Sequence, residues 1–350
     1  MFLTSTSANT SELHVFQDKA LDFCAIICLQ HYGRGPALGG CRMMSYPSIA
    51  VAIEEATRLA KAMSYKAALS ELPHDGGKAI IMRSHQPHHH HAVLQRFAEC
   101  VHSLNGRYIT TIDSGTSQAD MSIIKDKTAF VTGYLEEGCV VNNPSVFTAL
   151  GVFKGMEAAV KLTTGQDQLV GLHVAIQGVG NVGYHLAKLL HQAGARLTIC
   201  DIDPNRAMQC AAECHATVVS PSAIYAVPCD IFSPCALGQI LNAQTVPQLR
   251  TNIIAGAAND QLSSPVFADR LTQRNILYIP DYLINAGGLI QLSLQRDNKD
   301  QAAITDAVIH IGQRILYLAE KASLQKKTLF AAAEDAAEAG LTGKQCTMVS

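Results

Sequence analysis

Two lysines and one aspartate in the first half of the chain have the types and positions that acid–base chemistry needs. Lys78 follows two glycines in HDGGKAII, directly before an apolar stretch that predicts a strand. A lysine held against a glycine loop and partly desolvated has a lowered pKa, so it can act as a base near neutral pH. Lys66 follows a predicted helix, and Asp113 ends a predicted strand, where it could pass protons. Because most lysines are simply solvated, residue types alone favour a solvated, non-catalytic role for these lysines.

A glycine-rich turn in the second half has the spacing of a dinucleotide-binding loop. Gly178, Gly180 and Gly183 form G-x-G-x-x-G between a strand predicted over 173–177 and a helix predicted over 181–193. The amides at the start of such a helix face phosphates. The next predicted strand, 196–200, ends at Asp201, whose carboxylate can accept hydrogen bonds from both ribose hydroxyls of adenosine. This context predicts NAD binding, although nearby Arg206 could soften the discrimination against NADP.

The elements that position these residues alternate between strands and helices, which predicts an α/β fold. The first dozen residues are expected to be frayed, and 33–40 to be a loop. A helix over 145–161 is expected to bridge two domains, and the alternation resumes beyond it. The predicted strands are 21–30, 79–82, 107–112, 173–177, 196–200, 231–232, 253–254 and 276–279, and the predicted helices are 48–62, 91–104, 145–161, 181–193, 305–322 and 329–339.

Composition bounds the class of protein. A chain of 350 residues with 48% hydrophobic residues has enough apolar material for two domain cores. Charged residues make up 16%, with a net charge of -2, which argues against a nucleic-acid or membrane partner. The 11 cysteines form no CxxC pair, and no secretory segment is visible, so reduced thiols and a cytoplasmic location are expected.

Several motifs resemble the amino acid dehydrogenases of the glutamate/leucine/phenylalanine/valine family, in the same order from about 21 to 292. They are GPALGGCRM, the segments around Lys66 and Lys78, YITTIDSGT, NPSVFTALGVFKGM, QGVGNVGYHL, SPCALG, AGAANDQL and PDYLINAGGLI. Within this family, the chain most resembles the bacterial leucine, valine, phenylalanine and tryptophan dehydrogenases. The resemblance implies a substrate and oligomerisation domain over 1–142, onto which a C-terminal helix of about 325–350 folds back. It also implies a Rossmann doubly wound NAD-binding domain over 143–324, and a homo-oligomer, often a dimer or an octamer.

The resemblance also implies a role for each matching residue. Lys66 would bind the substrate carboxylate, Lys78 would activate the water that attacks the imine carbon, and Asp113 would relay protons. Asn259 would hold the substrate beside the nicotinamide, and Thr148 would contact the carboxamide. The implied substrate-binding residues are Leu38, Gly39, Gly40, Lys66, Thr111, Asn259, Leu289 and Leu292, and the implied cofactor-binding residues are Thr148, Gly178, Gly180, Asn181, Val182, Gly183, Asp201, Cys235, Ala236 and Asn285.

The implied side-chain pocket is formed by Leu38, Thr111, Leu289 and Leu292. It has no cation to meet a second carboxylate, which argues against glutamate as the substrate. Apolar pockets discriminate weakly by size, so the aromatic amino acids stay as an alternative to leucine, valine and isoleucine. The expected reaction is the reversible oxidative deamination of an apolar L-amino acid to a 2-oxo acid and ammonia.

Two positions depart from the family pattern. Asp75 replaces the first of the three glycines that usually precede the catalytic lysine, and Ile112 stands where a polar residue is common. The Asp75 carboxylate could pair with Lys78 and keep it protonated, could oppose the substrate carboxylate, or could turn away to solvent. A dinucleotide-binding homologue that has lost turnover is therefore an alternative. A hydroxy-acid dehydrogenase is a weaker one, because it needs a histidine–carboxylate pair that the sequence does not offer.

Two further features are set aside. His88 to His91, with His85 nearby, could suggest a metal site, but the sequence shows no acidic or cysteine partner close to them, and a solvated helix start is expected. Cys235 in SPCALG is expected to be a small packed residue near the cofactor rather than a nucleophile.

Overall fold

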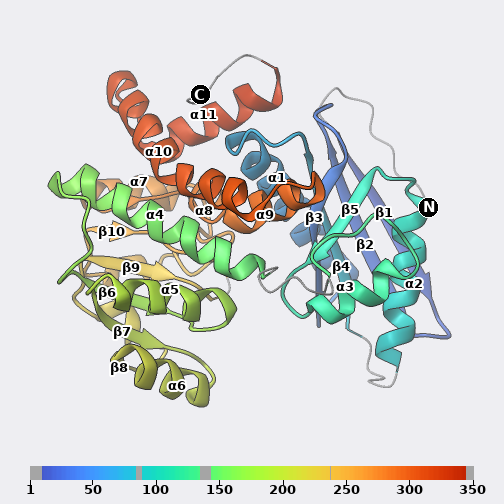
Figure 1. Cartoon of the computed structure of the whole chain (residues 1–350), viewed down its shortest axis with the longest axis horizontal. Helices are drawn as coiled ribbons and strands as arrows, with labels where there is room; N and C mark the ends of the chain where they lie inside the picture. Colours follow the sequence, from blue (N-terminus) through green and yellow to red (C-terminus); the bar gives the residue numbers. More distant parts are fainter. Residues whose placement is uncertain (1–9, 84–88, 135–142, 237, 344–350) are drawn as a thin grey trace. The chain divides into compact units, whose positions relative to one another are not determined.

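The computed structural model describes residues 10–83, 89–134, 143–236 and 238–343, and they divide into two compact units (Figure 1). Within those ranges, unit 1 comprises the residues up to Asn143 together with 337–343, and unit 2 comprises those from Pro144 to Ala336. Each unit contains its own sheet.

The described part of unit 1 contains a five-stranded sheet in the order β1-β2-β4-β3-β5. β1 and β2 pair antiparallel, as do β2 and β4, whereas β3 pairs parallel with both β4 and β5. The carboxyl ends of β3, β4 and β5 therefore lie at the same edge of the sheet. The strands are β1 (Thr10–Asp18), β2 (Phe23–His31), β3 (Ala37–Met44), β4 (Asp75–Met82) and β5 (Tyr108–Ile112), and the helices are α1 (Ile49–Leu69), α2 (His90–Ser103) and α3 (Gln118–Lys125).

Helices cover both faces of this sheet (Figure 1). Ser48 caps the start of α1, and its side chain accepts the amide of Val51 at 3.3 Å. Its small buried residues Ala52, Ala56 and Ala60 pack against Ile26 and Ile80, while α2 and α3 pack on the other face. Small side chains let α1 lie close to β4, so that residues of α1 reach the polar centre described below.

The described part of unit 2 contains a six-stranded parallel sheet in the order β11-β10-β9-β6-β7-β8, which is the doubly wound arrangement that the sequence predicts. α4 packs against α5, α9 and α10. The strands are β6 (His173–Gln177), β7 (Arg196–Cys200), β8 (Thr217–Val218), β9 (Ile231–Pro234), β10 (Ile253–Ile254) and β11 (Leu277–Tyr278), and the α-helices are α4 (Pro144–Thr164), α5 (Asn181–Gln192), α6 (Pro204–Cys214), α7 (Val266–Gln273), α8 (Asp281–Ile284), α9 (Gly287–Arg296) and α10 (Gln301–Gln325). The last α-helix, α11 (Leu329–Leu341), starts in unit 2, and its residues from Ala337 belong to unit 1.

Three predictions about the strands of unit 1 are wrong. β1 starts at Thr10, within the first dozen residues that were expected to be frayed, and it pairs with β2 up to Asp18; residues 1–9 of that stretch lie outside the described residues. The expected loop over 33–40 contains the start of β3. β4 starts at Asp75 rather than at 79, so that Gly76, Gly77 and Lys78 belong to the strand. Glycine is uncommon inside strands, which made these segments look like loops, but here it allows close backbone approach.

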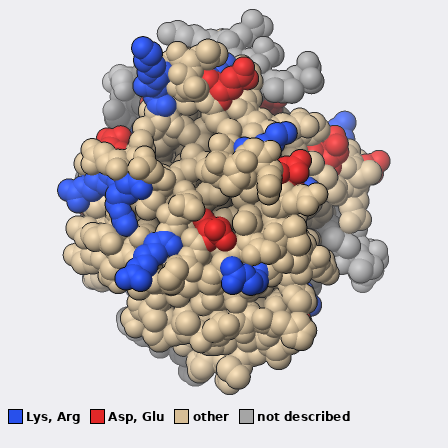
Figure 2. Space-filling view, turned by 90° about the vertical axis from the view of Figure 1, so that its left-hand side faces the viewer, with Lys and Arg blue, Asp and Glu red and all other residues tan. Residues whose placement is uncertain are grey.

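Charged side chains are scattered over the face of the molecule drawn in Figure 2, and most of that face belongs to other residue types. Within the described ranges, no helix is both long and apolar enough to cross a membrane. The cysteines in those ranges are free thiols, as expected.

Candidate active site

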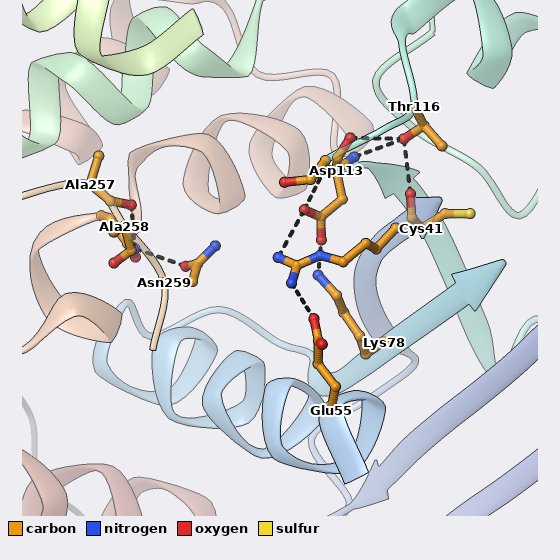
Figure 3. A network of polar contacts seen from close by, with 11 residues as sticks. Cys41, Glu55, Lys78, Asp113, Thr116, Ala257, Ala258 and Asn259 are labelled. Atoms are coloured by element: carbon orange, nitrogen blue, oxygen red, sulfur yellow. Dashed lines mark hydrogen bonds and ion pairs between the residues drawn. The ribbon is translucent and has the colours of Figure 1, made fainter. Parts of the chain in front are cut away.

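Lys78 and Asp113 form a buried ion pair in unit 1 (Figure 3). Lys78 lies in β4, Asp113 directly follows β5, and β3 runs between the two strands. The side chains of Lys78 and Asp113 are only 4% and 12% exposed, so water screens their interaction poorly. The structure thus brings together the two residues for which the sequence predicts proton transfer.

Gly40 of β3 provides the space in which this pair meets. The register of β3 on β4 pairs Leu38 with Gly76 and Cys41 with Ala79, which places Gly40 beside Lys78. On the other side, Gly40 pairs with Thr111 of β5. A Cβ atom at Gly40 would lie 2.8 Å from both Cβ and Oδ2 of Asp113, so a larger residue would displace the carboxylate.

Arg42 and Glu55 extend the ion pair into a network. One terminal nitrogen of Arg42 lies 3.5 Å from Oδ1 of Asp113, and the other contacts the carboxylate of Glu55 in α1. Sequence reasoning missed both residues. Arg42 belongs to the motif GPALGGCRM, where its place near the end of a strand would have been the signal, but β3 was not recognised as a strand.

The turn after β5 holds the backbone of Asp113. The Thr116 hydroxyl donates to the carbonyl of Cys41 at 2.9 Å and accepts the amide of Asp113 at 3.0 Å. The amide of Met43 donates to the carbonyl of Ser114 at 3.0 Å. These bonds attach the turn to β3, so the position of Asp113 is defined by two strands.

Burial lowers the pKa of Lys78 well below its ordinary value, and the positive charges of Arg42 and Lys66 lower it further. The carboxylate of Glu55 acts in the opposite direction, whereas burial raises the pKa of the Cys41 thiol and keeps that thiol neutral near pH 7. Asp113 also favours the ammonium form, since an opposite charge in contact stabilises it. Desolvation and the two cations outweigh these effects, so Lys78 loses its proton more easily than a solvated lysine does.

Lys66 lies in the last turn of α1, which extends to Leu69, and not after the helix as predicted; it is 7% exposed. It is close enough to Lys78 for its charge to lower the pKa of that residue. The neighbouring Tyr65 donates its hydroxyl to Glu338 of α11 at 2.8 Å, which fixes the end of α1. The second lysine predicted from the sequence therefore belongs to the same polar centre.

The Asp75 carboxylate neither pairs with Lys78 nor turns to solvent. It is 3% exposed, and its carboxylate accepts the amides of Tyr32 and Gly33 at 3.1 Å and that of Arg34 at 3.5 Å. The expectation that it turns to solvent is wrong, and the partner of Lys78 is Asp113 instead. Asp75 anchors the β2–β3 connection, because its carboxylate oxygens accept hydrogen bonds from amides that would otherwise have no acceptor.

The other predicted substrate-binding residues of unit 1 lie in the same strands. Leu38 and Thr111 are 1% and 3% exposed, and the hydroxyl oxygen of Thr111 has no hydrogen-bond partner among the described residues. The hydroxyl of Tyr108 donates to the carbonyl of Gly39 at 2.8 Å. Ile112, the second departure from the family pattern, packs against the core between the sheet and α2.

In unit 2, the predicted dinucleotide turn follows β6. Gly178 has φ +92°, and a Cβ atom there would meet Ala236, while one at Gly183 would lie 2.0 Å from the carbonyl oxygen of Gly178. Gly180 has open space beside it, and as the N-cap of α5 it provides no side chain to the amides that begin the helix with Asn181 and Val182. An open glycine next to uncapped amides fits a pyrophosphate.

Asp201 follows β7 and is bonded to the glycine-rich turn. Its Oδ2 accepts the amide of Val179 at 2.8 Å, and its Oδ1 accepts that of Asp203 at 2.9 Å. Arg206 lies 3.4 Å from the carboxylate of Asp203, with which it forms an exposed ion pair. Asp201 therefore lies next to the predicted phosphate site. Arg206, which could have softened the discrimination against NADP, is paired with Asp203 instead.

Polar residues after β10 and at the end of α8 form a further cluster. Nδ2 of Asn285 donates to the carbonyl of Ala257 at 3.0 Å and to Oδ1 of Asn259 at 2.8 Å (Figure 3). These bonds fix the orientation of the amide, and Oδ1 of Asn285 is buried without a partner among the described residues. A buried acceptor of this kind fits an amide donor such as the carboxamide of nicotinamide.

Thr148 and Cys235 make internal contacts. The Thr148 hydroxyl donates to the carbonyl of Pro144 at 2.9 Å and accepts the amide of Gly288 at 3.1 Å, so it joins α4 to α9. Burial raises the pKa of the Cys235 thiol, which makes it a poor nucleophile. Leu289 and Leu292, the predicted pocket residues of unit 2, are 6% and 5% exposed in α9.

The histidine-rich segment is only partly described, since His85 and His88 lie outside the described residues. Nε2 of His90 lies 2.8 Å from Oδ1 of Asp120, an acidic partner that is distant in sequence and was not expected. Within the described ranges, no group of three or more histidine, cysteine, aspartate or glutamate residues has the arrangement of a metal site.

Comparison with known proteins identifies the family. Residues 11–130 match the Glu/Leu/Phe/Val dehydrogenase dimerisation domain, and 142–203 and 198–311 match the Glutamate/Leucine/Phenylalanine/Valine dehydrogenase domain. The chain belongs to this family. The resemblance predicted from the motifs is confirmed, as is the fold of an N-terminal α/β domain followed by a Rossmann domain. Members of this family are NAD(P)-dependent amino acid dehydrogenases, so the protein is an oxidoreductase of this type.

The relatives of this chain are named for different amino acid substrates. Leucine dehydrogenase of Geobacillus stearothermophilus is 47% identical over 277 residues, which cover 79% of this chain and 76% of that protein. L-tryptophan dehydrogenase of Nostoc punctiforme is 40% identical over 315 residues, 90% of this chain and 88% of that protein. The crystal structure of an L-tryptophan dehydrogenase from Nostoc punctiforme matches with a TM-score of 0.78 and 36% identity over 96% of each chain.

Proposed function

We propose that this dehydrogenase uses NAD to deaminate an apolar L-amino acid oxidatively, with leucine, valine and isoleucine preferred. The products are the 2-oxo acid, ammonium, NADH and a proton. The observation that carries the proposal is the buried Lys78–Asp113 pair, in which desolvation and neighbouring cations favour a free amine on Lys78. A base of lowered pKa beside a carboxylate is what proton transfer to and from substrate nitrogen and water requires.

Each residue of the polar centre has a distinct part in this proposal. The ammonium group of Lys66 binds the substrate carboxylate through charge-assisted hydrogen bonds. Lys78 as a free amine takes a proton from the water that attacks the imine carbon. Asp113 passes protons to and from the substrate nitrogen. Lys78 would return to its free-amine form after each turnover because the low dielectric around it disfavours the ammonium form.

The second domain binds the cofactor. The glycine turn and the start of α5 would hold the pyrophosphate, Asp201 the adenosine ribose, and Asn259 and Asn285 the groups near the nicotinamide. When bound, NAD supplies the hydride acceptor. The exposed ion pair of Arg206 with Asp203 leaves Asp201 to repel a 2′-phosphate, which supports NAD over NADP.

The substrate preference rests on Leu38, Thr111, Leu289 and Leu292, which include no cation for a second carboxylate. An aromatic amino acid is the second candidate, since the L-tryptophan dehydrogenase relative is 40% identical to this chain. We also propose a homo-oligomer, supported by the match to the dimerisation domain, and a cytoplasmic location, supported by the abundant free thiols.

A substrate panel tests the proposal. The purified protein is mixed with NAD and, separately, L-leucine, L-isoleucine, L-valine, L-phenylalanine, L-tryptophan, L-glutamate or D-leucine, and NADH is followed by absorbance. We expect the highest kcat/KM with the branched aliphatic L-amino acids and none with D-leucine. The highest value with L-tryptophan or L-phenylalanine would establish the second candidate. A flat panel with intact NAD binding would support a homologue without turnover.

A further inference from the structure

Arg42 and Glu55 surround the Lys78–Asp113 pair, although neither is among the residues expected to contact substrate. The guanidinium of Arg42 bridges Oδ1 of Asp113 and the carboxylate of Glu55 (Figure 3). The Arg42 and Glu55 side chains are 11% and 21% exposed, which makes this bridge far less screened than a surface ion pair. A planar guanidinium has the fork geometry that two carboxylates require.

The two oxygens of the Asp113 carboxylate have different partners. Arg42 lies 3.5 Å from Oδ1, which also accepts the amide of Ser114 at 2.5 Å, and Lys78 contacts Oδ2. With Oδ1 held, the carboxylate cannot rotate away from Lys78 without losing its interaction with Arg42. Glu55 in turn holds Arg42 from α1, the helix that also contains Lys66.

We propose that Arg42 and Glu55 are positioning residues of the active site: Arg42 fixes the Asp113 carboxylate toward Lys78, and Glu55 fixes Arg42 and balances its charge. The inference rests on the proposed function, since it assigns Lys78 and Asp113 to proton transfer. It explains why a buried cation is placed beside a lysine that must lose its own proton.

The charges around Lys78 come from three elements, and they determine in which direction each substitution should shift the pKa of Lys78. Arg42 lies on β3, Lys66 and Glu55 lie on α1, and Asp113 lies at the end of β5. The Cys41 thiol of β3 is neutral, because burial raises its pKa. From β2, the register places the Cys28 thiol opposite Lys78, and burial raises its pKa, which keeps it neutral. Tyr46 is adjacent to Arg42 and Glu55, and burial raises its pKa to about 12, so it is also neutral near pH 7.

Arg42 and Glu55 therefore act on Lys78 in opposite directions. The cation of Arg42 lowers the pKa of Lys78, and the carboxylate of Glu55 raises it. Arg42→Gln should move the rising limb of kcat/KM against pH to higher pH, and Glu55→Gln should move it to lower pH, each by up to about one unit. The amine of the substrate titrates identically in all variants, so it does not contribute to the difference.

Arg42→Lys separates charge from geometry. Lysine keeps the positive charge but cannot contact both carboxylates with a planar fork. We expect its rising limb to stay near that of the wild type while kcat falls and KM changes little. Arg96→Gln is the matched control, because Arg96 also belongs to unit 1 and pairs with Glu99 at 2.9 Å, but on the surface of α2. It should leave both kcat and the pH profile unchanged.

A second readout does not need turnover. The wild type and both glutamine variants are treated with acetic anhydride over a range of pH without substrate, and acetylation of Lys78 is quantified by mass spectrometry. The midpoint should rise in Arg42→Gln and fall in Glu55→Gln. If Arg42→Gln does not fold, the isosteric Glu55→Gln alone decides the sign. Shifts in the same direction, or none, would overturn the inference. Opposite shifts in a protein that oxidises no amino acid would support the charge arrangement and contradict the proposed function.

Discussion

Lys78 and Asp113 meet over Gly40, a residue of the strand that separates them. Lys78 belongs to β4 and Asp113 follows β5, while β3 lies between these strands in the sheet. The two side chains contact each other because Gly40 has no Cβ atom, which would lie 2.8 Å from Asp113 Oδ2. The glycine pair in the motif GPALGG is therefore part of how the proton-transfer groups are assembled, in addition to its predicted place beside the substrate.

Gly40→Ala should displace the Asp113 carboxylate while the fold survives. Misplacing a catalytic group by about 1 Å costs about 10²-fold in rate, so we expect a loss of that order in kcat. NAD affinity should be unchanged, because the nucleotide turn belongs to unit 2. Gly340→Ala is a suitable control, since a Cβ atom there makes only an ordinary contact of 3.4 Å with Ala68. Wild-type kcat in Gly40→Ala would show that Asp113 does not need this space.

Asp75→Gly should reduce stability rather than change the pH dependence of activity. The change removes the acceptor for the amides of Tyr32, Gly33 and Arg34 at a site that is 3% exposed. Leaving buried donors unsatisfied costs about 1–3 kcal/mol, to be measured by urea unfolding. Asp75→Asn retains one acceptor oxygen and should lose less. A rising limb that moved to lower pH in Asp75→Gly would restore the direct effect on Lys78.

Asp201→Ser tests cofactor choice. The wild type should prefer NAD, because the Asp201 carboxylate repels a 2′-phosphate. Serine keeps an acceptor for the amide of Val179, which Asp201 binds at 2.8 Å, but removes the charge. The ratio of kcat/KM for NAD over NADP should fall by roughly tenfold, the equivalent of about 1.4 kcal/mol. Comparable efficiencies of the wild type with both cofactors would refute the assignment, and Asp306→Ser on the exposed face of α10 is the control.

Thr111→Val tests whether the substrate side chain is apolar. The Thr111 hydroxyl oxygen is buried without a partner among the described residues, so valine should raise the free energy of unfolding, by about 1 kcal/mol or less. With an apolar substrate, kcat/KM for L-leucine should change by no more than a few fold. A large loss with the fold intact would mean that the hydroxyl binds the substrate, which would favour a side chain with a hydrogen-bonding group.

The nucleotide-binding half could be predicted closely because its signals are local. The strands over 173–177 and 196–200 have the predicted bounds, and both are short apolar runs that are mostly buried. The glycine spacing and Asp201 lie within one strand–helix–strand unit. In such a unit, residues that are close in the sequence are also close in the structure, so the site can be predicted from spacing along the chain.

The substrate half was harder to predict because its site depends on pairing between distant segments. β3 and β4 contain glycine pairs that are typical of loops, and only their pairing in the sheet makes them strands. Arg42 lies 71 positions from Asp113 in the sequence, so its role could not be found from spacing. Likewise, the partners of Asp75 lie more than 40 positions away, in a connection that had been expected to form one longer loop.

The most direct test of the account is the turnover of Lys78→Ala with L-leucine and NAD. Loss of a general base costs about 10²–10⁴-fold, so kcat/KM should fall by that amount at the pH where the wild type is most active, and the rising limb assigned to Lys78 should disappear. NAD affinity, measured by calorimetry, should match that of the wild type and of the exposed control Lys127→Ala. Retention of most of the activity by Lys78→Ala would contradict the account, because the base would then lie elsewhere.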